Sequence, residues 1–211
     1  MTGFYGGLSA SVVILTLFLG AGSHAAAPAA LGDALWAHGV LGPRLRRFAA
    51  VALPVAEGVL GAVGAIALLT GHQWGLRAVL ALGAVLFGLY AGYTRHVLTL
   101  GRGGPCGCSG RDVPLSRWVT RRAVALAVLA TAGAAVAGTG PVGLPTVELI
   151  TLTLAALACT ALLWAIPAAM HEPAAAPVHP PTRVPDHQQA RTTVHRTAEG
   201  VQTPWTSPPA P

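Results

Sequence analysis

Five long apolar blocks constrain the fold of this chain more than any other feature of its sequence. A helix needs about 20 apolar residues to cross a bilayer, and five stretches reach or approach that length. Because a backbone exposed to lipid must satisfy its own hydrogen bonds, each stretch is predicted to be a helix. The expected spans are about 8–27, 49–70, 76–98, 118–139 and 144–170.

The composition excludes an ordinary soluble domain. Of the 211 residues, 53% are hydrophobic and 9% are charged, whereas a soluble domain has about 25% charged residues. Mean hydropathy is +0.60. The chain is therefore predicted to be a multi-pass protein of the cell membrane, with the lipid bilayer as its surroundings. Its net charge of +6 requires no nucleic-acid partner, because membrane orientation and anionic head groups account for it.

The first apolar block has a second interpretation as a cleaved signal peptide, since small residues follow it. Signal peptides begin with basic residues, however, and residues 1–11 contain neither Arg nor Lys. We therefore expect this block to remain in the protein as a membrane helix.

The distribution of Arg residues predicts the orientation in the membrane. The Arg-rich regions are the connection after the first block, the connection after the third block with the block ends that flank it, and the C-terminal tail. They carry Arg44, Arg46, Arg47, Arg95, Arg102, Arg111, Arg117, Arg121, Arg122, Arg183, Arg191 and Arg196. The other connections carry only Arg77. Because basic loops remain in the cytoplasm, the N-terminus is expected outside and the C-terminus inside.

The C-terminal tail, residues 171–211, differs from the rest of the chain. It holds nine of the 17 prolines and has no apolar run. Such a segment cannot bury enough surface to offset the entropy of ordering it, so it is predicted to be disordered.

Two of the three cysteines, Cys106 and Cys108, lie in the stretch GGPCGCSG at residues 103–110. In an extended chain their Cα atoms are about 7 Å apart, at the edge of disulfide reach, and a bend at Gly107 closes the gap. The small ring that results is strained and exchangeable, which suits a redox relay. Arg102 and Arg111 favour the thiolate, and the Gly-rich loop is expected to keep both sulfurs accessible.

Two other interpretations of the two cysteines stay open. Their thiolates and His96 offer three metal ligands, although a closed zinc site usually needs four. Alternatively, both are small residues in a Gly-rich loop. The third cysteine, Cys159, lies in the middle of the fifth block and is expected to be a small buried hydrophobe. The sequence assigns no metal and no cofactor.

Glu57 is an acid inside the second apolar block, about 12 Å below its start. An acid at such a depth is a functional candidate, because burying its charge in lipid is costly. Arg95 or His96, at the same end of the third block, is expected to reach down toward it. The pair either locks the two helices together or forms part of a proton relay. Pro54, one turn before Glu57, is expected to kink the helix.

These residues together resemble the MauE family of methylamine utilisation membrane proteins, which are similar in general form to DoxX-like four-helix bundles. The matching motifs are a P-x-x-E-G helix, a C-G-C-[FS]-G loop and an Arg-rich entry to the next helix. They fall on Pro54, Glu57 and Gly58, then on Cys106, Gly107, Cys108 and Gly110, and then on Arg121 or Arg122. At Ser109 the family pattern leads one to expect Phe.

The resemblance covers about residues 4–140. It implies an all-α fold, a polytopic membrane helix bundle with a four-helix MauE-like or DoxX-like domain at 4–140. A fifth transmembrane helix at 144–170 and the Pro-rich tail at 171–211 complete the expected organisation.

The resemblance also implies a role in methylamine metabolism. The family supports maturation of methylamine dehydrogenase, whose small subunit is rich in disulfides, together with a thioredoxin-like partner. Cys106 and Cys108 are then the catalytic pair, supported by Glu57, Arg95, His96 and Gly107. The alternatives are a non-catalytic membrane assembly factor and a transporter of small solutes or metals that uses Glu57.

One expectation conflicts with another. Disulfides form outside the cytoplasm, whereas the Arg distribution puts the two cysteines inside. The conflict is resolved if the orientation is inverted, if the loop dips into the membrane, or if the cysteines pass reducing equivalents outward.

Overall fold

The computed structural model describes residues 2–107, 113–136 and 145–170. Within these residues it contains six helices and no strand. They are α1 (Thr2–Ala26), α2 (Pro28–His38), α3 (Pro43–Leu69), α4 (Gln73–Thr99), α5 (Arg117–Val136) and α6 (Thr146–Ala169). The prediction of an all-α fold is confirmed. The predicted disordered tail lies outside the described residues.

Five of these helices are long and apolar enough to cross a membrane, namely α1, α3, α4, α5 and α6. The prediction of five membrane-spanning helices is confirmed, with ends that differ by a few residues. Many large apolar side chains remain exposed on the surfaces of these helices, including Ile66, Leu89 and Leu154. In a bilayer such side chains face lipid, where their exposure costs nothing.

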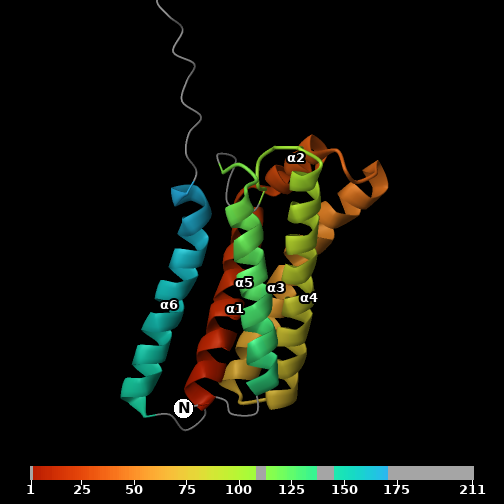
Figure 1. Cartoon of the computed structure of the whole chain (residues 1–211). Coiled ribbons are helices and arrows are strands. Elements are labelled where there is room, and N and C mark those ends of the chain that lie inside the picture. The colour runs from red at the N-terminus through yellow and green to blue at the C-terminus, as the bar shows by residue number, and fades with distance from the viewer. Residues whose placement is uncertain (1, 108–112, 137–144, 171–211) are drawn as a thin grey trace, which may run out of the picture. The chain divides into compact units, whose positions relative to one another are not determined.

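The helices α1, α3, α4 and α5 form an antiparallel bundle, and α6 lies along its outside against α1 and α5 (Figure 1). Leu17, Leu80, Leu126 and Ala130, from α1, α4 and α5, are fully buried in the core between the helices. Since α6 adds only Ala156 to the buried members of this core, the four-helix bundle builds most of its own interior.

The short helix α2 was not predicted. It lies at one end of the bundle, beside the connection between α4 and α5 (Figure 1). Pro28 begins it, and Gly39 ends it in the left-handed conformation with φ of 61°, which are ordinary signals for the two ends of a helix. Eleven residues are too few to span a bilayer, so a search for membrane spans passes over it.

The first turns of α3 lean away from the other helices (Figure 1). Pro54 lies inside α3, where a proline removes a backbone hydrogen bond and bends a helix. The helix then continues to Leu69, and Glu57 lies on the part that follows Pro54.

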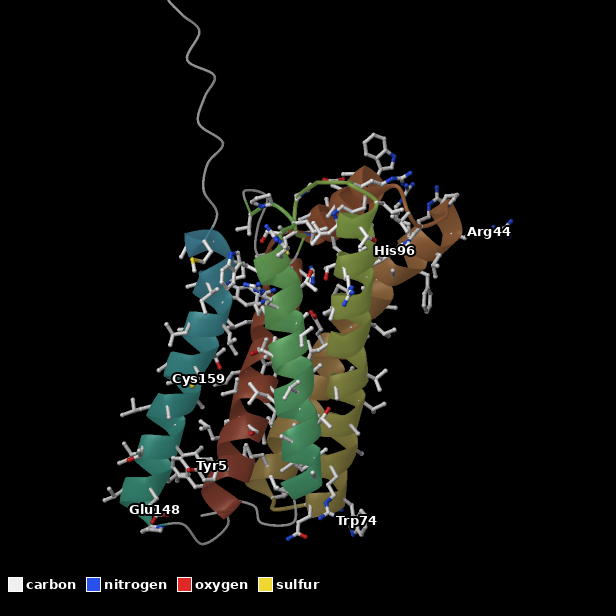
Figure 2. The ribbon with its side chains drawn as sticks, viewed as in Figure 1. Tyr5, Arg44, Trp74, His96, Glu148 and Cys159 are labelled. Atoms are coloured by element: carbon white, nitrogen blue, oxygen red, sulfur yellow. The ribbon has the colours of Figure 1, made fainter. Side chains whose placement is uncertain are left out.

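The two ends of the bundle differ in charge. We call the end that contains α2 and the α4–α5 connection the loop end. Arg44 and His96 lie there, whereas Trp74 and Glu148 lie at the opposite end (Figure 2). The antiparallel arrangement brings most of the Arg residues in the described segments to the loop end, with Arg44, Arg46, Arg47, Arg95, Arg102, Arg117, Arg121 and Arg122. Arg77 lies near the start of α4, at the opposite end.

Candidate functional site

The connection between α4 and α5 is held by paired backbone. The amide of Cys106 donates a hydrogen bond of 2.8 Å to the carbonyl of Val113, and the amide of Leu115 donates one of 2.8 Å to the carbonyl of Gly104. Pro105 and Pro114 form an isolated antiparallel bridge between these bonds. The two described arms of the loop are therefore fixed against each other, which positions Cys106.

Cys106 is buried, with 6% of its surface exposed, among Val97, Leu115 and Val119. The expectation that the glycine loop keeps this sulfur accessible is wrong, because the paired arms turn the side chain toward the helices. Cys108 lies outside the described residues, as do Gly110 and Arg111.

Gly107 adopts φ of +74°, so it supplies the left-handed bend that the sequence predicted between the two cysteines. It also packs tightly on α2. A Cβ atom at Gly107 would lie 2.9 Å from the Cβ of Ala34. Both the conformation and the space at this position therefore favour glycine.

Glu57 lies in the middle of the bundle and is only 4% exposed. Tyr90 on α4 donates a hydrogen bond of 2.8 Å from its hydroxyl to Oε1 of Glu57. His24 on α1 places its Nε2 3.6 Å from Oε2 of Glu57. We call Glu57, Tyr90 and His24 the acid cluster, and it joins three helices.

The expected pairing of Glu57 with Arg95 or His96 is wrong, since both of these side chains are exposed on α4. Helix geometry gives the reason. Arg95 follows Tyr90 by five residues, which places it about 140° around α4 and away from the face that carries Tyr90.

Arg122 on α5 lines the same internal space as Glu57. Its guanidinium also lies over the indole ring of Trp164 on α6, with 5.0 Å from Cζ to the ring centroid. A stacked guanidinium keeps a fixed position. In the sequence Arg122 belongs to an Arg-rich helix entry, and no pattern there connects it to the buried acid.

His38 at the end of α2 forms a second polar contact near the loop. Its Nδ1 lies 3.0 Å from the hydroxyl of Tyr93, and the side chain is buried. Arg102 donates hydrogen bonds from Nη1 to the carbonyls of His38 and Gly39, at 3.2 and 2.7 Å. Arg102 therefore fastens the end of α4 to α2, a role that the sequence did not predict for it.

A cavity of about 80 Å³ connects these groups. A buried water needs about 10–15 Å³, so the cavity has room for several water molecules. Its lining includes Cys106 at the loop end, His38 on α2, and Glu57, His24, Tyr90 and Arg122 from the bundle. The fold thus opens the candidate cysteine and the membrane-embedded acid onto one internal space.

The described residues do not supply a set of zinc ligands. Among them, no three His, Cys, Asp or Glu side chains come together as metal ligands would. His96, the third ligand that the sequence offered, points away from the bundle as an exposed side chain.

Comparison with known families decides the wider relationship. Residues 3–137 match the family described as "Methylamine utilisation protein MauE". The chain belongs to the MauE family. The match ends one residue beyond α5, so it covers the four-helix bundle of this MauE protein, together with α2, and leaves α6 outside. Neither curated proteins nor solved structures gave a match.

Of the residues at the site, sequence reasoning had identified Cys106, Gly107 and Glu57 and had missed the partners of the acid. His24 had a usable signal, because a titratable residue near the end of an apolar block is unusual. Tyr90 had none, since tyrosine is common in membrane helices and lies 33 residues from Glu57.

The stability of this MauE protein should depend on pH through His38. Burial lowers the pKa of His38 from 6.5, and the carbonyl of Pro105 partly opposes this effect. The unfolded chain therefore binds more protons than the folded one between the lowered pKa and 6.5. We expect stability that is complete above pH 6.5 and declines as the pH falls toward the lowered pKa.

The measurement is thermal unfolding in detergent at a series of pH values. The variant His38→Gln should show a weaker loss on acidification, because its side chain does not titrate. His96→Gln, which changes an exposed histidine at the same end, should behave as the wild type. Identical profiles for the wild type and His38→Gln would contradict the assignment.

Proposed function

We propose that this MauE protein is a membrane thiol–disulfide exchange protein in which Cys106 and Cys108 form the exchanging pair. The observation that carries the proposal is the placement of Cys106. Paired backbone holds it at an internal cavity, and Gly107 next to it bends the chain through a left-handed conformation. A loop of merely small residues needs neither feature.

The exchange conserves atoms and electrons. A thiolate of a partner dithiol attacks one sulfur of the Cys106–Cys108 disulfide, whose S–S bond breaks as a mixed disulfide forms. The second thiolate of the partner then displaces the bound sulfur. The partner leaves as a disulfide, and Cys106 and Cys108 are left as thiols. The reverse sequence oxidises the pair.

The family resemblance suggests the partners. We propose a thioredoxin-like protein as the dithiol and methylamine dehydrogenase as the protein whose maturation benefits. The proposed functional unit is the four-helix domain at 4–140, to which the fifth helix at 144–170 and the tail at 171–211 are additions.

The proposed location is the cell membrane, with the loop end on the cytoplasmic side and the N-terminus outside. The support is the concentration of Arg at the loop end, since basic loops are retained in the cytoplasm. In this orientation the pair meets a partner dithiol on the cytoplasmic side, which agrees with the reducing state of the cytoplasm.

Thiol labelling tests the exchanging pair and its side of the membrane. On a Cys159→Ala background, a membrane-impermeant maleimide is applied to whole cells and to opened membranes, before and after reduction. We expect no labelling of whole cells, and in opened membranes we expect labelling that requires prior reduction. The variant Cys108→Ser keeps Cys106 as its loop cysteine. Because Cys106 is buried, this variant should label more slowly than Cys106→Ser.

Each other outcome has a defined meaning. Labelling of whole cells overturns the orientation. Labelling of opened membranes that is unaffected by reduction contradicts a resting disulfide. If maturation of the dehydrogenase survives loss of both cysteines but fails in Glu57→Gln, the function is transport and not exchange. If maturation survives the cysteine changes and Glu57→Gln alike, the function is a non-catalytic assembly role.

A further inference from the structure

One oxygen of Glu57 has no hydrogen bond within the described residues. Tyr90 serves Oε1, whereas Oε2 is buried without a hydrogen-bond partner there and faces Nε2 of His24 at 3.6 Å. A buried polar atom without a partner destabilises the fold, because it has lost its hydrogen bonds to water and gained none in return. Such a cost is tolerated where the atom binds a proton or an internal water.

The chain makes space for this carboxyl group at Gly20 on α1. A Cβ atom there would lie 2.7 Å from Oε2, 2.9 Å from Cδ and 3.0 Å from Oε1 of Glu57. Any side chain at this position would therefore push the carboxyl group from its place. Glycine at this position leaves room for the carboxyl group of Glu57. Packing of the two helices alone would not require that room.

The acid opens onto the cavity that also reaches Cys106. Waters held by the polar groups of its lining, among them His38 and Tyr93, would carry a proton between the carboxyl group and the sulfur. Nη1 of Arg122, another buried atom without a hydrogen-bond partner in the described segments, faces the same region. Waters in the cavity would satisfy both atoms.

The charged and titratable groups around Glu57 come from every helix packed against it. They are His24 on α1, Tyr90 on α4 and Arg122 on α5, while His38 on α2 and Tyr93 on α4 line the same cavity nearer the loop. Arg122 balances the charge of an ionised Glu57, and His24 can hold a proton next to it. The cluster therefore tolerates both the proton-bound and the proton-free state.

We propose that Glu57, positioned by Tyr90 and His24, is the internal proton donor and acceptor for the thiol chemistry of Cys106. This inference rests on the proposed thiol–disulfide exchange and adds the route of its proton. When the S–S bond opens, the Cys106 thiolate takes a proton that Glu57 gives up through cavity water. Glu57 then regains a proton released by the partner dithiol at the loop end, so the exchange consumes no net protons.

The first test is time-resolved infrared spectroscopy of the full-length protein in lipid nanodiscs while dithiothreitol reduces the disulfide. A transient loss of the carboxylic C=O band, as Glu57 gives up its proton and regains it, is expected in the wild type and absent in Glu57→Gln. Glu148→Gln, which changes an exposed acid at the opposite end of the bundle, should retain it. Tyr90→Phe should move the frequency of the band without abolishing it.

The second test is the rate of reduction by dithiothreitol as a function of pH. Loss of a general acid lowers a rate by about 10²-fold or more, so Glu57→Gln should be slower by that factor and lose a step in its pH profile. Thermal unfolding of each variant confirms that it is folded, and Glu57→Asp serves as a second variant that keeps a carboxyl group and should recover part of the rate.

The outcomes separate the two proposals. If the wild type forms the Cys106–Cys108 disulfide but its carboxylic band and rate are the same in Glu57→Gln, the proton route is wrong and the exchange stands. If the wild type forms no such disulfide, the exchange is wrong and the proton route falls with it.

Discussion

Replacing Gly20 with alanine is expected to lower the free energy of unfolding by about 1–3 kcal/mol. The added methyl group meets three atoms of the Glu57 carboxyl group at 3.0 Å or less, so the carboxyl group must move. Movement breaks the hydrogen bond from Tyr90, and a buried acid without its donor is costly. Reversible unfolding in mixed micelles, followed by circular dichroism, measures the difference.

Gly22→Ala is the matched control for this prediction. Gly22 lies on the same helix, and a Cβ atom there would meet nothing within 4 Å. Its replacement should leave stability unchanged or raise it by up to about 1 kcal/mol, because alanine has the higher helix propensity. If Gly20→Ala and Gly22→Ala lowered the free energy of unfolding equally, α1 would require glycine at both positions. The close approach of Gly20 to Glu57 would then make no contribution of its own to stability.

The second large effect is expected for Gly107→Ala, in the loop beside Cys106. A residue with a Cβ atom costs about 1–2 kcal/mol in the left-handed conformation, which Gly107 occupies with φ of +74°. The contact of 2.9 Å with Ala34 adds an overpacking cost of about 1–3 kcal/mol. The sum is a loss of about 2–5 kcal/mol, measurable by the same unfolding experiment.

Gly101→Ala separates the two causes. Gly101 also has a positive φ, at +65°, but a Cβ atom there would meet nothing within 4 Å. It should show the conformational cost of about 1–2 kcal/mol alone. A smaller loss at Gly107 than at Gly101 would show that α2 moves aside freely and does not hold the loop.

The membrane helices were predictable because one quantity, the length of an apolar run in the sequence, determines whether a segment can span a bilayer. A run such as that of α6 has no other stable state in lipid, and its ends follow from Pro145 before it and Met170 after it. The helix α2 depends on a different property, the packing of Leu31 and Ala34 against the loop around Gly107. A search for membrane spans does not register contacts of that kind.

The candidate site was half predictable for the same reason. Glu57 and Cys106 are unusual residues in their own segments, so the sequence alone identifies them. Their partners depend on which helices become neighbours and which faces meet. The sequence suggested Arg95 for Glu57 because both lie near the same end of the bundle, and only the rotation of α4 about its axis shows that Tyr90 takes that place.

The helix α6 has a consequence that its small share of the buried core conceals. Four crossings return a chain to the compartment in which it began, and a fifth makes the number odd. The family match ends at residue 137, so a protein made of the matched region alone would have both termini on one side. By adding α6 after that region, this chain leaves the membrane at Met170 on the side of the Cys106 loop (Figure 1). A helix that contributes little to the core thus decides at which end of the bundle the chain leaves its last described helix.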